Sequence, residues 1–146
     1  MKNRIVIGQL EPKAYEAMMA MEKYLSKSTL ELGLTELIRL RASQINGCAY
    51  CIEMHSEGAL KQGQPQNKVF AISAWWESPL FSDKEKSAFA MKDEITLISE
   101  GGVSDETFDT ARTHFSENEI AQMIMLIGLI NTWNRIAVST HMFHTK

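Results

Sequence analysis

The sequence has few of the residues that interrupt helices or cross-link chains. Its 146 residues include only three prolines, eight glycines and two cysteines. No segment alternates apolar and polar residues as a half-buried strand would, and Met, Ala, Leu, Glu and Lys recur throughout. Two cysteines are too few for a disulfide-rich scaffold. The sequence therefore predicts an all-α protein.

Charge and hydrophobic runs exclude further classes of protein. The 15 Lys and Arg residues and 18 Asp and Glu residues give a net charge of -3, without the clustered basic face that nucleic acids require. The longest uncharged run, residues 120–134, is shorter than the ~20 residues of a membrane-spanning helix. The opening MKNRIVIGQLEPK has too short an apolar run for a signal peptide. We expect a cytoplasmic protein that binds neither nucleic acid nor a membrane.

Helix start and stop signals divide the chain into about six or seven helices in a single domain, residues 1–146. Pro12 suits the first position of a helix because its missing N–H would be unpaired there anyway. The pairs Ser82 and Glu85, and Ser116 and Glu119, have capping-box spacing. The expected helices span residues 12–28, 33–45, 48–62, 66–78, 82–99, 104–115 and 116–143.

The last segment is apolar nearly all round. Its apolar residues are Ile120, Met123, Ile124, Met125, Leu126, Ile127, Leu129, Ile130, Trp133 and Ile136. A helix of this kind is either central to the core or buried in a subunit contact. We expect both, and hence a homo-oligomer.

Both cysteines lie in the segment INGCAYCIEMHSEG, with a histidine four residues after the second. At about 100° per residue, Cys48, Cys51 and His55 fall within a helical stripe ~60° wide. The positive end of a helix stabilises a thiolate, and an imidazole can relay protons near neutral pH. Two sulfurs at this spacing can form a bridge once one of them is oxidised to a sulfenic acid. The pattern predicts a peroxidatic thiol with its own resolving partner.

Two other interpretations of the cysteines compete with redox chemistry. Buried free cysteines are common in cores, where they behave as small hydrophobes. A zinc site would need the two thiols, His55 and a fourth ligand from His114, His141 or His144. Structural zinc usually takes four ligands from separated segments, and catalytic sites rarely place three on one helix. Redox chemistry is therefore favoured, and we expect no bound metal.

The segment TELIRLRASQINGCAYCIEMHSEGALKQG, residues 35–63, resembles the core of the alkylhydroperoxidase D-like proteins of the carboxymuconolactone decarboxylase superfamily. RIVIGQLEPKAYEAMMAMEKYL, SAWWESPLFSDKEKSAFAMKDEIT and NEIAQMIMLIGLINTWNRIAVST also look like its small single-domain members. The shared motif is E-x11-C-x2-C-x3-H. The resemblance implies an orthogonal helical bundle that assembles as a trimer or hexamer.

The resemblance also assigns roles to four residues. Cys51 would attack the peroxide, and Cys48 would resolve the product. Glu36 would be the base of a proton relay that includes His55. No cofactor is expected to be bound, and an external dithiol, of lipoyl or redoxin type, would return the cysteines to thiols.

Two of these assignments have alternatives in the residues themselves. The helix end alone would favour Cys48 as the attacking thiolate, whereas His55, one turn from Cys51, favours Cys51. Glu36 could instead be a solvated side chain paired with Arg39 three residues on.

Aromatic residues near the motif are weaker candidates for the substrate pocket. Tyr50 stands where better-studied members carry a second histidine, and a phenol relays protons less readily near pH 7. Trp75 and Trp76 are expected mainly in core and interface packing, with Trp75 as a candidate for the pocket entrance. Asn134 and Arg135 match an NR pair of the family that lies near the site, and Arg135 is expected mainly in an ion pair or a subunit contact.

The leading hypothesis is a thiol-dependent antioxidant peroxidase that reduces small-molecule hydroperoxides. One alternative is a lyase of the carboxymuconolactone decarboxylase type, whose chemistry does not need a cysteine pair. The other is a non-catalytic oligomeric module whose dithiol senses oxidants or holds a metal.

Overall fold

The computed structural model describes residues 2–143, and no strand is present among them. The α-helices are α1 (Ile7–Leu10), α2 (Pro12–Leu25), α3 (Leu32–Ile45), α4 (Ala49–Lys61), α5 (Gln66–Ala71), α6 (Asp83–Thr96), α7 (Asp105–Arg112) and α8 (Glu117–Thr140). Two 3₁₀ turns, Ile72–Ala74 and Ile98–Glu100, follow α5 and α6. The all-α prediction is confirmed.

Two features differ from the sequence expectation. Helix α1 was not predicted, because four residues are too few to show a helical period. The helix expected over 66–78 ends at Ala71 and tightens into the 3₁₀ turn, within which Ile72 is buried. Trp75, directly after that turn, packs against Phe89 of α6 with ring centroids 5.9 Å apart. Tertiary packing has overridden the local preference for one longer helix.

The starts of α6 and α8 follow the predicted capping boxes. The Ser82 hydroxyl accepts a hydrogen bond from the Glu85 N–H (3.2 Å), and the Glu85 carboxylate accepts one from the Ser82 N–H (2.8 Å). Ser116 and Glu119 make the same exchange at the start of α8. These bonds satisfy helix N–H groups that have no partner within the helix, and so fix where both helices begin.

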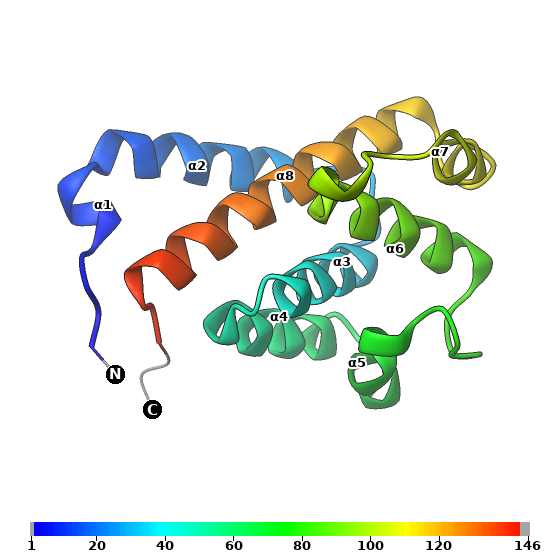
Figure 1. The fold of residues 1–146 in the computed structure, drawn as a ribbon, viewed down its shortest axis with the longest axis horizontal. Coiled ribbons are helices and arrows are strands. Elements are labelled where there is room, and N and C mark those ends of the chain that lie inside the picture. Colours follow the sequence, from blue (N-terminus) through cyan, green and yellow to red (C-terminus); the bar gives the residue numbers. More distant parts are fainter. Residues whose placement is uncertain (1, 144–146) are drawn as a thin grey trace.

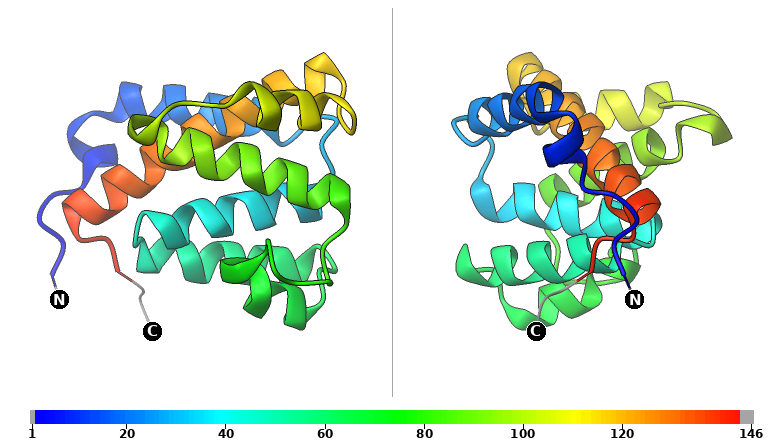
Figure 2. Two further views of the ribbon diagram at one scale, coloured as in Figure 1. Left: turned by 45° about the vertical axis from the view of Figure 1, so that its right-hand side comes forward. Right: turned by 90° about the vertical axis from the view of Figure 1, so that its left-hand side faces the viewer.

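Helix α3 lies at the centre of the fold. It packs against α4 on one side and against α6 and α8 on the other, while α2 runs along α8 (Figures 1 and 2). Its side chains supply much of the fully buried core, with contributions from α6 and α8. These residues include Leu37, Ile38, Leu40, Phe89, Met91, Met123, Ile127 and Ile130. The central position of α3 brings Glu36, on the same helix, next to α4.

Helix α8 buries part of its apolar surface and exposes the rest. Many of its apolar side chains are buried in the core, whereas Ile124, Met125 and Val138 are exposed. Helix α2 buries only Leu25 completely. The segment before α1 lies close to the end of α8 (Figure 1), and the Arg4 N–H donates to the Thr140 carbonyl at 2.9 Å.

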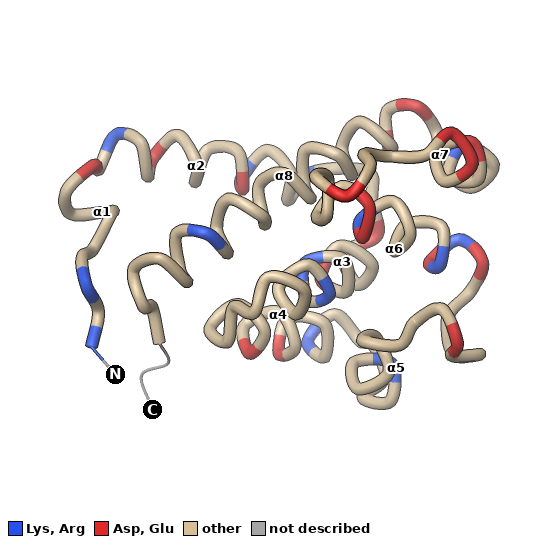
Figure 3. The backbone as a smooth tube through the Cα atoms, in the orientation of Figure 1, with Lys and Arg blue, Asp and Glu red and all other residues tan. Residues whose placement is uncertain are grey.

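Charged residues are spread over the helices rather than concentrated. Figure 3 shows acidic and basic positions interspersed along α2, α4 and α6. Within residues 2–143, no helix is both long enough and apolar enough to cross a membrane.

One ionisable side chain, that of Lys92, is fully buried between α3 and α6. The Lys92 Nζ contacts the Asp93 carboxylate, which also accepts a hydrogen bond from the Trp75 indole N–H at 3.0 Å. Burial, with repulsion from the nearby Arg41 guanidinium, lowers the pKa of Lys92 from 10.5 to about 6. At neutral pH, Lys92 is therefore mostly uncharged in the folded protein.

The depressed pKa of Lys92 predicts a pH dependence of stability. Between pH ~6 and ~10.5 the unfolded chain binds this proton and the folded chain does not, so the contribution of Lys92 to the unfolding free energy rises with pH. The slope is at most about 1.4 kcal/mol per pH unit. Melting temperatures of wild type and Lys92→Met, measured from pH 6 to 9, should converge as pH rises. A constant difference between them would contradict this account.

Candidate active site

The turn between α3 and α4 places a cysteine at the start of α4. Gly47 has a positive φ of 66°, which glycine adopts without steric cost, and the turn ends at Cys48 with φ -89° and ψ 92°. The Cys48 N–H donates to the Ser43 carbonyl at 3.0 Å. Cys48 is therefore the N-cap of α4. The helix was expected to begin at Cys48 and instead begins one residue later, at Ala49.

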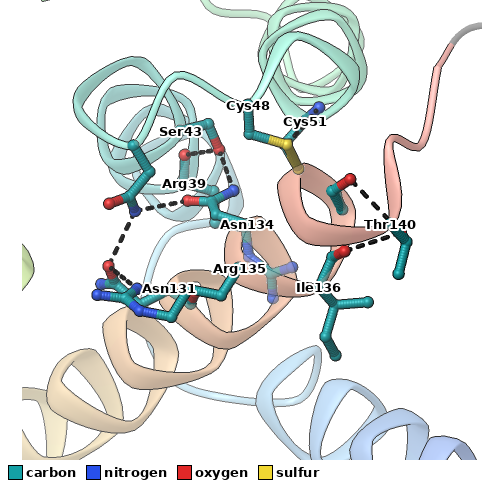
Figure 4. Close-up of a disulfide and its surroundings, with 11 residues drawn as sticks. Arg39, Ser43, Cys48, Cys51, Asn131, Asn134, Arg135, Ile136 and Thr140 are labelled. Carbon is teal, nitrogen blue, oxygen red and sulfur yellow. Dashed lines mark hydrogen bonds between the residues drawn. A yellow bond between two sulfur atoms is a disulfide. The ribbon is translucent and has the colours of Figure 1, made fainter. Parts of the chain in front are cut away.

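Cys48 and Cys51 form a disulfide (Figure 4). Their Cα atoms are 5.3 Å apart, and the Cys51 N–H donates to the Cys48 sulfur at 3.3 Å. Both residues are about 2% exposed. The predicted juxtaposition of the two sulfurs is present, although Cys48 reaches it from the cap position rather than from a helical turn.

Glu36 of α3 reaches across to His55 of α4. The Glu36 Oε2 lies 2.8 Å from the His55 Nδ1, and the His55 side chain is almost completely buried. Glu36 is not paired with Arg39, as its alternative interpretation required, because Arg39 makes a two-pronged ion pair with Glu22 of α2 at 2.7 and 3.1 Å. The structure therefore brings Glu36 to the helix that carries both Cys51 and His55.

The carboxylate determines which nitrogen of the neutral ring carries the proton. A carboxylate only accepts hydrogen bonds, so His55 Nδ1 donates and Nε2 keeps its lone pair. This Nε2 atom is buried and has no hydrogen-bond partner among the described residues. His55 thus has an unoccupied acceptor on the ring that Glu36 orients.

Cys51 and His55 line one cavity of about 480 Å³. Its wall is mostly apolar and comes mainly from α2, α3, α4 and α8. The lining residues are Tyr15, Met19, Glu22, Glu36, Arg39, Tyr50, Cys51, Met54, His55, Gly58, Trp133, Ala137 and Met142. Glu36 and Tyr50 are among them, so four of the predicted site residues share the cavity. Cys48 lies behind Cys51 and is not part of the wall.

Trp75 lies outside this cavity and packs against the core, as mainly expected, rather than at the cavity entrance. Its indole N–H is bonded to Asp93, and its ring packs against Phe89, so α6 holds it away from Cys51. The tryptophan in the cavity wall is Trp133 of α8.

Sequence reasoning missed the group that attaches α2 to the cavity. Glu22 accepts hydrogen bonds from the Arg39 guanidinium and from the Trp133 indole N–H, the latter at 2.8 Å. Tyr15 packs edge-on against Trp133, with ring centroids 5.4 Å apart. The contacts of Glu22 and Tyr15 with Trp133 join segments more than 100 residues apart, and no local spacing in the sequence indicates them.

A buried polar network connects the turn before Cys48 to α8 (Figure 4). The Asn46 amide donates to the side-chain oxygens of Asn131 and Asn134, both at 2.9 Å. Asn134, fully buried, donates in turn to the Ser43 hydroxyl at 3.0 Å. Arg135, expected in an ion pair or a subunit contact, donates to the carbonyl and side chain of Asn131.

The histidines of the zinc interpretation are not gathered at the cysteines. His114 is half-buried in the turn before α8, and His141 caps the far end of α8 in a left-handed conformation with φ 56°. His144 lies outside the described residues. Among residues 2–143, no group of three His, Cys, Asp or Glu side chains is arranged to hold a metal ion.

Comparison with known proteins agrees with this arrangement. Residues 12–94, more than half of the chain, match the sequence model of the Carboxymuconolactone decarboxylase family. The chain belongs to this family. YdfG of Bacillus subtilis (strain 168), an uncharacterized protein, is 37% identical to this family member over 139 residues, which is 95% of each chain.

Solved structures extend the likeness to the whole fold. ATU0492 of Agrobacterium tumefaciens, a protein of unknown function suggested to be the antioxidant defence protein AhpD, superposes with a TM-score of 0.96 at 41% identity over 99% of both chains. The debrominase Bmp8 gives a TM-score of 0.79 at 21% identity, over 91% of this chain and 72% of its own, and shares the fold. This carboxymuconolactone decarboxylase family member is thus an alkylhydroperoxidase D-like helical bundle.

The asparagine network predicts a measurable stability difference. Asn134→Ala should lower the unfolding free energy by ~1–3 kcal/mol, because Asn46 and Ser43 lose a buried hydrogen-bond partner. Thr132→Ala is the control: it is exposed on the same helix and should change stability by less than about 0.5 kcal/mol. Urea denaturation at equal protein concentration checks both, and equal losses would contradict a special role for Asn134.

Proposed function

We propose that this protein is a thiol-dependent peroxidase that reduces hydroperoxides through a Cys48–Cys51 dithiol/disulfide cycle. The observation that supports it most is the placement of Cys51 in a cavity wall beside a histidine that a carboxylate orients. The family and the ATU0492 relative, suggested to act in antioxidant defence, agree with this chemistry.

The first step is formation of the Cys51 thiolate. His55 Nε2 is the acceptor for the thiol proton, while Nδ1 stays bonded to Glu36. The Glu36 carboxylate stabilises the imidazolium that results and completes the relay. The helix start adds a partial positive charge near the sulfur.

The thiolate then attacks the distal oxygen of the hydroperoxide. An S–O bond forms and the O–O bond breaks, which gives the Cys51 sulfenic acid and an alkoxide, or hydroxide from hydrogen peroxide. The proton held by the relay passes to the leaving oxygen, so the product is an alcohol or water. Tyr50, in the cavity wall, can donate a hydrogen bond to that oxygen.

Cys48 resolves the sulfenic acid. Its sulfur attacks the Cys51 sulfur, and water leaves as the disulfide forms. In the disulfide the two Cα atoms are 5.3 Å apart, a usual separation for this bond. An external dithiol of lipoyl or redoxin type then reduces the disulfide by thiol exchange and becomes a disulfide itself. Such a cycle suits a reducing compartment such as the cytoplasm.

The protein should act as a homo-oligomer, a trimer or hexamer. Helices α2 and α8 leave large apolar side chains exposed, which a partner subunit would cover. These side chains include Tyr15, Met19, Tyr24, Ile124, Met125 and Val138.

The central test is consumption of an organic hydroperoxide by the fully reduced protein with a dithiol present. Wild type should turn over, whereas Cys51→Ser should fall to background because it has no attacking sulfur. With no dithiol present, reduced Cys48→Ser should consume one equivalent of hydroperoxide and accumulate a sulfenic acid at Cys51, which dimedone labelling and mass spectrometry detect, whereas wild type should form the disulfide. The two variants form a matched pair.

The results also separate the alternatives. Equal rates for wild type and Cys51→Ser would remove the mechanism, and thiol-independent turnover of a carboxymuconolactone would favour a lyase. Stoichiometric zinc in protein purified under reducing conditions would favour a metal-holding module.

Assembly is tested by light scattering coupled to size exclusion. The expected mass is three or six times the 16.5 kDa of one chain. Replacing exposed Met125 of α8 with Glu should lower that mass, because a charge cannot be buried in an apolar contact without cost. A monomeric wild type would contradict the proposed assembly.

A further inference from the structure

Gly58 of α4 lies directly beneath the Glu36 carboxylate. A Cβ atom at Gly58 would be 2.5 Å from the Glu36 Oε2 and 2.9 Å from its Cδ, closer than side chains pack. The Glu36 carboxylate therefore occupies space that a side chain at position 58 would need.

The backbone gives no reason for glycine at this position. Gly58 is within α4, and its φ is not among the positive values of the chain, so its conformation is open to any residue. Glycine within a helix is less stable than alanine, because it loses more conformational freedom on folding. The absence of a Cβ thus carries a stability cost that the backbone conformation does not explain.

The contact involves the same atom that holds His55. Glu36 Oε2 is the oxygen 2.8 Å from His55 Nδ1, and Gly58 follows His55 by three residues, on the same face of α4. A Cβ at position 58 would push away the oxygen that orients the imidazole. The Glu36 side chain is flexible and partly exposed, so it can move aside without disturbing the core.

We propose that Gly58 is a positioning residue: its bare surface seats the Glu36 carboxylate against His55, and any side chain there uncouples the relay. The proposal rests on the proposed function, since it concerns the same relay. It assigns the effect of Gly58 to proton transfer rather than to folding.

Four proteins test it: G58A, E36Q, the double variant G58A/E36Q, and G128A as the matched control. Gly128 is an exposed glycine within α8, and a Cβ there meets nothing within 4 Å. Three measurements are made on each: kcat/KM with an organic hydroperoxide, the rate of Cys51 alkylation by iodoacetamide across pH 5 to 10, and the melting temperature.

G58A should match E36Q in chemistry and be no less stable than E36Q. We expect kcat/KM to fall by about tenfold or more in both G58A and E36Q, and the pH midpoint of Cys51 alkylation to move in the same direction in both. The double variant should be no slower than E36Q alone, because both changes remove one interaction. G58A should melt at or above the temperature of E36Q, because both lose the bond to the buried His55 and alanine favours the helix; G128A should melt at or above the wild-type temperature and keep wild-type rates.

Several outcomes would overturn the proposal: wild-type rates and alkylation profile in G58A, additive losses in the double variant, or a G58A protein that melts well below E36Q. Alkylation needs no peroxide, so it decides the role of Gly58 even if wild type fails to turn over. That failure would count against the peroxidase function alone.

Discussion

The hydrogen bond between Glu36 and His55 is the contact on which the rest of the site depends. It joins the central helix α3 to the helix that carries the cysteines, and it determines which nitrogen of His55 is left to accept a proton. Three features of the fold make it possible: the tight turn at Gly47, the close packing of α3 on α4, and the missing side chain at Gly58. Cys51 of the disulfide precedes His55 by four residues, and both line the same cavity.

Polar contacts attach the surrounding helices to the two sides of the site. Asn134 of α8 binds both Asn46 and Ser43, so the turn that presents Cys48 is attached to the longest helix. On the other side of the cavity, Glu22 attaches α2 to Arg39 and Trp133. Buried polar groups are costly unless they are satisfied, and a satisfied network admits few other arrangements. These contacts therefore give the cavity a defined shape.

Sequence reasoning succeeded where the signal is local. The helical period, the capping pairs at Ser82 and Ser116, and the spacing of Cys48, Cys51 and His55 are all properties of short segments, and the structure contains each of them. It failed where the outcome depends on distant packing. The bond of Trp75 to Asp93 and the place of Trp133 in the cavity wall depend on contacts between helices, so no local spacing indicates them.

The sequence by itself determined that the chain is helical, where most helices begin, and that two sulfurs and an imidazole share one side of α4. Each of these follows from backbone geometry and from neighbours within about four residues. Only the tertiary structure decided that Glu36 faces His55 rather than Arg39, that Glu22 takes Arg39 instead, and that Gly58 leaves room for the carboxylate. These pairings depend on how α2, α3 and α4 pack against one another. The local sequence does not specify that packing, so it cannot specify which partner each side chain contacts.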